Sequence, residues 1–290
     1  MNPNRLIPII LLPAGSVLLL AGNVLLAGHA ARQGASSAAH PGYLRVGDIP
    51  VPEGYVRVLA AEHSFAAWLR ALPLKKDRTV YLYNGESKRN QNAQFAVLDV
   101  SVNDPSVRPG HPEGAAVPRD LQQCADAIMR LRAEYLYEQR DFIHIEFHSS
   151  QGTRFNFAQW LKERGAAPAN EAAIRKNFGK FMEKVFTYCG TLSLERQLVA
   201  GGGPEKMEIG DVLIHGGSPG HAMLIIDMAM DGRSGRKVYL LAQGYMPAQD
   251  IHIVHDPEDD KLDPWYPADG KTVYTPEYTF YAGQMRAWPR

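Results

Sequence analysis

The chain of 290 residues carries 31 basic and 31 acidic side chains, so its formal net charge is zero. This balance excludes the strongly basic surface of a nucleic-acid-binding protein and argues against a strongly charged membrane patch. An apolar content of 45% and an aromatic content of 9% indicate a packed globular protein and exclude a disordered chain.

The N-terminal segment, residues 1–30, has the order of a secretory signal. Arg5 precedes an almost wholly apolar stretch, and small residues at Gly28 and Ala30 follow it. The apolar stretch of about 21 residues is also long enough to span a bilayer. Cleavage after Ala30 and retention as an N-terminal anchor therefore both stay open. In either case we expect export to the periplasm or cell envelope, with membrane contact only through this segment if it is uncleaved.

A short tether is expected between this segment and the fold. Residues 31–43 are rich in alanine, serine and glycine, a composition typical of a flexible linker. The remaining residues, 44–290, have the length of one large domain. The sequence therefore predicts a signal or anchor, a linker and a single folded domain.

Hydrophobic periodicity and β-forming residues predict both helices and strands in this domain. In chain order the expected elements are a strand at 55–59, a helix at 64–72, strands at 79–83 and 95–102, a helix at 120–137, a strand at 142–147, helices at 155–164 and 171–188, and strands at 211–215, 222–228, 237–242, 250–254 and 277–280. Long helices followed by a run of strands joined by short turns indicate the α+β class, with the helices packed on a mainly antiparallel sheet.

The expected helix that carries Cys124 has a polar residue suited to its start. Asp120 follows a proline and is expected to be the N-cap, which places Cys124 in the second turn. Arg130, Arg132 and Glu134 are expected to form the solvent face of the helix or a local ion pair; a clamp for a substrate is the alternative interpretation.

Three residues of this sequence fit the requirements of cysteine catalysis. Cys124 lies on a helix, His221 opens a strand after a glycine- and proline-rich turn, and Gln243 ends the next strand. A histidine in contact with a thiol can take its proton, and a third polar side chain can orient the imidazole. The residue order therefore predicts a Cys124–His221–Gln243 arrangement, in which Cys124 is the nucleophile and His221 the base.

This pattern resembles the NlpC-type branch of the papain-like cysteine peptidases. In that branch a cysteine begins a helix, a Gly-Asp-led strand precedes a His-led strand, and a polar residue ends the following strand. The corresponding stretches here are Gly210–Leu213, His221–Ile225 and Leu240–Gln243. The resemblance implies a papain-like domain that hydrolyses peptide amide bonds, with cell-wall peptide as the substrate.

A second resemblance extends over nearly the whole chain after the N-terminal segment. Several stretches resemble a family of exported bacterial proteins known as domain of unknown function 4846. These stretches are Val51–Tyr55, Gln123–Ala127, Arg130–Leu136, Gly217–Ala222 and Gln243–Asp250. This resemblance implies export and a single domain, and it implies no particular activity.

Two alternatives to a cysteine hydrolase stay open. His144, Glu146 and His148 alternate along one expected strand and are of the types that bind zinc, which would suit a metal-dependent hydrolase. The other alternative is a non-enzymatic binding domain of the cell envelope on the same scaffold.

The leading prediction is an exported cysteine peptidase or amidase that needs no cofactor. Its partner would be peptidoglycan or another extracytoplasmic peptide, and no nucleic acid. Cys189 precedes a glycine near a helix end and is expected to be structural, without a disulfide bond to Cys124.

Overall fold

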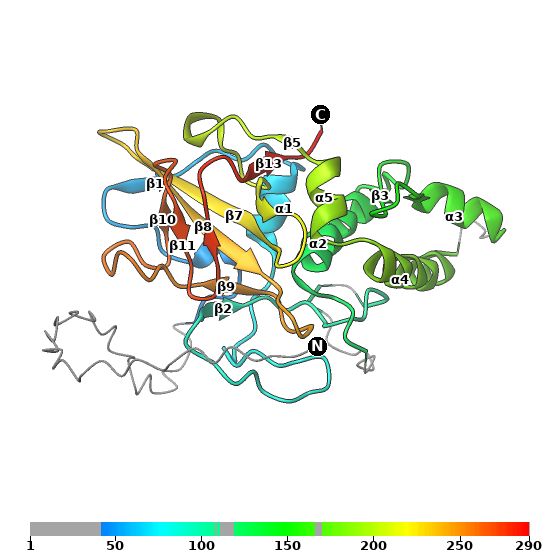
Figure 1. Ribbon diagram of the computed structural model, residues 1–290. Coiled ribbons are helices and arrows are strands. Elements are labelled where there is room, and N and C mark those ends of the chain that lie inside the picture. The colour runs from blue at the N-terminus through cyan, green and yellow to red at the C-terminus, as the bar shows by residue number, and fades with distance from the viewer. Residues whose placement is uncertain (1–41, 108, 111–118, 166–169, 290) are drawn as a thin grey trace, which may run out of the picture. The chain divides into compact units, whose positions relative to one another are not determined.

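The computed structural model describes residues 42–107, 109–110, 119–165 and 170–289 (Figure 1). The expected signal or anchor, 1–30, and most of the expected linker, 31–43, lie outside these residues. Among the helices that are described, none combines the length and the apolar character needed to cross a membrane.

The described strands form a nine-stranded sheet in which every pairing is antiparallel. Its order is β2-β9-β8-β7-β6-β13-β5, with β1 beside β7 and β10 beside β8. The strands of this sheet are β1 Tyr55–Arg57, β2 Gln94–Val97, β5 Val199–Ala200, β6 Val212–His215, β7 His221–Asp231, β8 Lys237–Gln243, β9 His252–Val254, β10 Tyr266–Pro267 and β13 Met285–Ala287. Two small two-stranded sheets pair β3 Glu146–His148 with β4 Arg154–Asn156, and β11 Val273–Tyr274 with β12 Thr279–Phe280.

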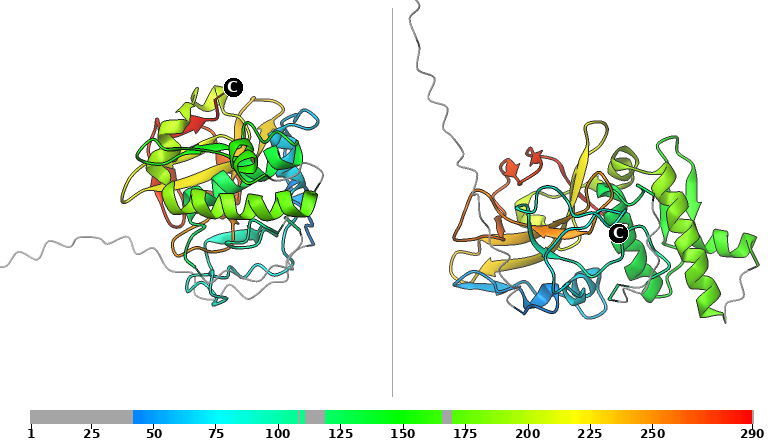
Figure 2. Two further views of the ribbon diagram at one scale, coloured as in Figure 1. Left: turned by 90° about the vertical axis from the view of Figure 1, so that its right-hand side faces the viewer. Right: turned by 90° about the horizontal axis from the view of Figure 1, so that it is seen from below.

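The helices are gathered on one side of this sheet (Figures 1 and 2). Their bounds are α1 Phe65–Ala71, α2 Cys124–Glu138, α3 Phe157–Glu163, α4 Glu171–Tyr188 and α5 Thr191–Gln197, with short 3-10 turns at Val46–Asp48 and Pro204–Lys206. Helix α2 packs against β7 and β8 and also against α4, so it lies between the sheet and the outer helices. The domain is therefore α+β, as the sequence predicts.

The sheet separates two apolar clusters, one on each of its faces, and strand β7 contributes residues to both. Ala222 and Leu224 belong to the larger cluster, which includes the buried residues of α2. Met223 and Ile225 belong to the smaller cluster on the opposite face, together with Phe280 of β12. Because successive strand residues point to opposite faces, His221 shares the face of Met223.

Helix α2 begins later than the sequence predicts. The structure starts it at Cys124, because Asp126 accepts a hydrogen bond from the backbone N–H of Gln123 at 3.0 Å and so satisfies the helix start. Asp120 is instead engaged by the N–H of Ala248, at 2.6 Å from its Oδ1. The placement of Cys124 in the second turn was wrong, because it lies in the first.

Other element predictions have mixed outcomes. Helix α4 spans the predicted residues 171–188, and the predicted strands 211–215, 222–228, 237–242 and 250–254 correspond to β6 to β9. The predicted strand 79–83 forms only isolated bridges at Tyr81 and Leu82. Helix α5 was not predicted, because a short helix between turns leaves little periodic signal.

For Arg130 and Glu134 the prediction of a solvent face was wrong, and the prediction of a local ion pair is confirmed. Both side chains are fully buried, with Arg130 Nε 2.7 Å from Glu134 Oε1. Arg175 of α4 adds a second cation, 2.6 Å from Glu134 Oε2. Arg130 and Arg175 also donate to the carbonyl of Val107, so the cluster ties α2, α4 and this loop together. Arg132 lies over the ring of Phe65.

Candidate functional site

Cys124 is the first residue of α2, where the helix presents unpaired backbone N–H groups. Its side chain is half-buried and its thiol is free. The partial positive charge of a helix N-terminus favours a thiolate there. The structure therefore moves the cysteine to a more favourable helix position than the sequence predicts.

The first turn of α2 lies directly against the end of β8. A Cβ atom at Gly244, the residue after this strand, would lie 3.0 Å from the carbonyl oxygen of Gln123. At Gly220, the residue before β7, a Cβ would lie 2.4 Å from the oxygen of Gly217. Both positions need glycine because backbone segments approach closely there. The contact at Gly244 brings the start of α2 to the end of β8.

His221 and Gln243 are joined at this end of the sheet. His221 begins β7, Gln243 ends β8, and His221 Nε2 lies 2.7 Å from Gln243 Oε1. His221 is 2% exposed and Gln243 is 1% exposed. The sequence-predicted pair is therefore brought together by the antiparallel register of the two strands.

The neighbours of Gln243 fix the orientation of its amide. Its Nε2 donates to Glu277 Oε2 at 2.7 Å and lies 3.1 Å from Nε2 of His252. His252 uses its other ring nitrogen on the backbone carbonyl of Asp250, at 2.9 Å. A carboxylate can only accept, so the amide nitrogen must face Glu277 and the oxygen must face His221. His221 therefore donates through Nε2–H, which leaves a lone pair on Nδ1.

A buried ion pair anchors this network. Lys88 Nζ lies 2.6 Å from Glu277, and both side chains are largely buried. Burial acts to raise the pKa of Glu277, but hydrogen bonds from His252 and Lys88 outweigh it and lower the pKa to about 2. Glu277 is thus a fixed negative charge that holds Gln243 in place.

The thiol and the imidazole are both neutral at neutral pH. Burial raises the pKa of the Cys124 thiol to about 11, and Asp126 adds to the shift, whereas the N–H groups of Ala125 and Ala222 act against it. Burial lowers the pKa of His221 to about 4, although Gln243 acts against this. A neutral imidazole is the form that can accept a proton.

The thiol of Cys124 influences the pKa values of groups that also surround His221. Ala222, whose N–H acts on Cys124, is the residue next to His221. Cys124 in turn helps to raise the pKa values of Tyr245 and Tyr278, for which burial is the main cause. The rings of Tyr245 and Tyr278 lie 4.9 and 5.1 Å from that of His221. The thiol thus shares its neighbours with His221, but the two make no direct hydrogen bond in the described part of the chain.

A comparison with models of protein families shows to which family the protein belongs. The model of the family described as "Domain of unknown function (4846)" matches residues 47–287. The chain belongs to this family. The family prediction made from the sequence is thereby confirmed. No curated protein and no solved structure matches the chain.

In this member of the domain of unknown function (4846) family, the three residues of the types that bind zinc, His144, Glu146 and His148, form ion pairs or hydrogen bonds with other side chains or with each other. His144 Nδ1 lies 2.7 Å from Asp141. Glu146 pairs with Arg154 at 2.5 Å and lies 3.2 Å from His148. Among the described residues, no group of three histidine, cysteine, aspartate or glutamate side chains could hold a metal ion.

The second cysteine, Cys189, lies at the other end of a different helix from Cys124. Cys189 ends α4 and is also a free thiol. Burial raises its pKa to about 12, with Asp126 adding to the shift. The carboxylate of Asp126, whose own pKa burial raises well above its usual range, thus acts on both cysteines.

Sequence reasoning missed several residues of this site. They are Lys88, Asp126, Tyr245, His252, Glu277, Tyr278 and Phe280. Glu277 is 34 residues from Gln243 and 189 from Lys88 along the chain. No local pattern signals contacts at such separations, so only the fold could reveal them.

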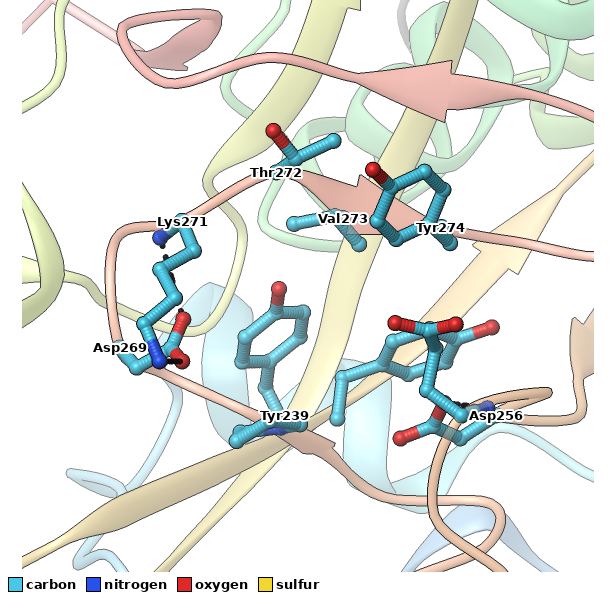
Figure 3. Close-up of a pocket in the computed structure, with 10 residues that line it drawn as sticks. Tyr239, Asp256, Asp269, Lys271, Thr272, Val273 and Tyr274 are labelled. Atoms are coloured by element: carbon cyan, nitrogen blue, oxygen red, sulfur yellow. Dashed lines mark hydrogen bonds and ion pairs between the residues drawn. The ribbon is translucent and has the colours of Figure 1, made fainter.

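The described cavity lies elsewhere. A pocket of about 380 Å³ is lined by residues of β8, β10, β11 and the loop after β9, among them Tyr239, Asp256 and Tyr274 (Figure 3). Cys124, His221 and Gln243 do not line it. The candidate catalytic residues and this pocket are therefore two different places on the domain.

Proposed function

We propose that the protein is an exported cysteine hydrolase that cleaves amide bonds on a papain-like scaffold of the NlpC type. One observation carries this proposal: the hydrogen bond from His221 Nε2 to Gln243 Oε1. This bond leaves Nδ1 of His221 as an acceptor beside the strand end that Cys124 approaches. Cysteine catalysis needs a thiol and an oriented imidazole, and the oriented imidazole of His221 and the free thiol at the start of α2 support this proposal.

The proposed reaction uses these groups in sequence. The thiol of Cys124 gives its proton to Nδ1 of His221 as the sulfur attacks the carbonyl carbon of the substrate. The amine leaves with the proton from His221, and a thioester remains on Cys124. Water then attacks the thioester, His221 takes a proton from this water, and the acid is released as the proton returns to the thiol. Gln243 keeps the imidazole oriented throughout.

The neutral state of the pair agrees with general-base activation rather than with a resting ion pair. A thiol with a pKa of about 11 is protonated at neutral pH, and an imidazole with a pKa of about 4 is free to accept a proton. This chemistry requires no cofactor. Peptidoglycan or another extracytoplasmic peptide is the proposed substrate, a choice that rests on the resemblance to NlpC-type peptidases.

The test compares three single variants of the full chain. Purified cell-wall peptides are incubated with each protein, and mass spectrometry measures cleavage of amide bonds. Cys124→Ser and His221→Ala should each lower the rate by at least ~100-fold, because each removes a group that moves the proton or forms the thioester. Cys189→Ser is the matched control and should keep the rate of the wild type. Full activity of Cys124→Ser, with the fold intact by circular dichroism, would rule out Cys124 as the nucleophile, and no cleavage by the wild type would rule out the hydrolase.

A non-enzymatic envelope binding domain is the second candidate. It is favoured by the 2% exposure of His221 and by the raised pKa of Cys124, since a catalytic group must meet its substrate. This candidate predicts that wild type and Cys124→Ser bind the peptides equally and that neither cleaves them.

A further inference from the structure

The pocket away from the candidate catalytic residues is built from separate parts of the chain. Tyr239 comes from β8, Tyr266 from β10, Tyr274 from β11 and Asp256 from the loop after β9. Its volume of about 380 Å³ is within the range of small-molecule sites, about 300–1,000 Å³. Figure 3 shows the side chains of these segments arranged around one space.

Asp256 is the unusual residue of this pocket. The side chain is 4% exposed, and its Oδ1 accepts a hydrogen bond from the N–H of Glu258 at 2.9 Å. Its buried Oδ2 has no hydrogen-bond partner within the described residues. Figure 3 shows Asp256 among the side chains that surround the pocket. An unpaired buried carboxylate oxygen is costly, so a bound donor would stabilise it.

The charged groups around Asp256 favour a positively charged donor. Burial raises the pKa of Asp256 to about 6; the N–H of Glu258 acts against this, and the carboxylates of Asp263, Asp259 and Glu258 raise it further. The charged side chains that shift its pKa are therefore all acidic. His255 is engaged by Asp263, at 2.7 Å.

The lysine of the pocket does not neutralise Asp256. Lys271 Nζ lies 3.0 Å from Asp269, and its side chain is 79% exposed. The lining thus contains the carboxylates of Asp256, Glu258 and Asp269 against a single cation that already has a partner. A ligand with a positive charge would complete the charge balance of this pocket.

The walls are suited to an alkyl or ring body next to that charge. The rings of Tyr239 and Tyr266 are stacked, with centroids 5.8 Å apart and planes inclined by 18°. Tyr266 donates its hydroxyl to the carbonyl of His255, which holds its ring in place. Aromatic faces attract cations and pack against methylene groups. In the described residues no metal-type cluster competes with this interpretation.

We infer that this pocket binds the primary ammonium group of an alkylamine, with Asp256 as the counter-ion and the rings of Tyr239 and Tyr266 against its methylene chain. The ammonium donates to Oδ2 of Asp256. Two sources offer this chemistry: a free diamine and the lysine side chain of a peptide. The inference does not depend on the proposed hydrolase, because Cys124 and His221 do not line the pocket.

Calorimetric titration of the full chain tests the inference. The probes are 1,5-diaminopentane, Nα-acetyl-lysine amide and, as the matched control without a charge, Nα-acetyl-norleucine amide. We expect saturable binding of the ammonium compounds and none of the norleucine compound. Tighter binding of the diamine would indicate a free amine as the ligand, and tighter binding of the lysine amide a peptide side chain.

Two further measurements locate the binding. Asp256→Asn keeps the acceptor for Glu258 N–H and removes the charge, so affinity should fall at least ~10-fold. Glu62→Gln, whose side chain is 90% exposed and outside the pocket lining, should bind like the wild type. In the wild type, affinity should fall about 10-fold from pH 7.5 to pH 5, since Asp256 takes up a proton near pH 6. Binding of the norleucine compound, or unchanged affinity in Asp256→Asn, would overturn the inference.

Discussion

Gln243 shows how one side chain can connect two parts of a site. Its oxygen accepts from His221, and its nitrogen donates to Glu277, which is itself paired with Lys88. A glutamate at this position would repel Glu277, and a leucine would leave the Nε2–H of His221 without an acceptor. The amide is thus the residue type that satisfies both neighbours at once.

The buried imidazole of His221 predicts a pH dependence of stability. In the folded protein it stays neutral down to a pKa of about 4, whereas in the unfolded chain it takes up a proton below about pH 6.5. Between these values the unfolded state binds more protons, so the free energy of unfolding decreases as the pH falls. The slope is ~1.4 kcal/mol per pH unit, or roughly 3 kcal/mol over the whole window. Above about pH 6.5 His221 adds no pH dependence.

Urea denaturation at pH 7.5, 5.5 and 4.5 measures this effect. The raised pKa of Asp256 acts in the opposite direction, because the folded protein binds that proton first as the pH falls. The comparison is therefore between wild type and His221→Gln, in which the contribution of Asp256 cancels. We expect the wild type to lose more stability than the variant at low pH, and parallel profiles would contradict this.

At the scale of elements, a buried charged cluster joins α2 to α4. Glu134 lies between Arg130 and Arg175, and all three side chains are buried. The two arginines also bind backbone carbonyls at Asp104 and Val107. Because Cys124 begins α2, this cluster helps to set the position of the helix that carries the proposed nucleophile.

Glu134→Gln should therefore be strongly destabilising. It leaves two buried arginines without their carboxylate, for which we expect a loss of about 3–5 kcal/mol in the free energy of unfolding. Glu183→Gln is the matched control: it removes the partner of Arg119 in an exposed pair and should cost less than about 1 kcal/mol. Chemical denaturation of both variants measures the difference. Equal losses in the free energy of unfolding would show that the buried cluster stabilises the fold no more than the exposed ion pair does.

At the scale of the whole molecule, the N-terminal segment predicts where the protein is located. Residues 1–30 combine a positive charge, an apolar stretch and small residues before the expected cleavage point. The proposed substrates are extracytoplasmic, so export is a condition for the proposed function.

Cell fractionation and N-terminal sequencing test this prediction. We expect the protein in the envelope or periplasm, either beginning near Ala31 or retained with the whole segment as an anchor. A variant without residues 1–30 should stay in the cytoplasm. Recovery of the uncut chain as a freely soluble cytoplasmic protein would contradict the prediction.

The sequence by itself determined the family, the α+β class and the position of most long elements. Helix α4 carries apolar residues at helical spacing, and strand β7 is a nearly continuous apolar run bounded by turn residues, so both can be predicted from local sequence. The pairing of His221 with Gln243 was also accessible, because two strands joined by a short hairpin can pair in few ways. These features depend on residues that are close together in the chain.

Only the tertiary structure decided the surroundings of those residues. Asp120, the predicted N-cap of α2, instead accepts a hydrogen bond from the N–H of Ala248, 128 residues away. The burial of Arg130 and Glu134 depends on Arg175 from another helix, without which polar residues would face solvent. The same is true of Glu277 behind Gln243 and of the pocket around Asp256. Contacts between distant segments leave no periodic signal, because their cause is the packing of the folded chain.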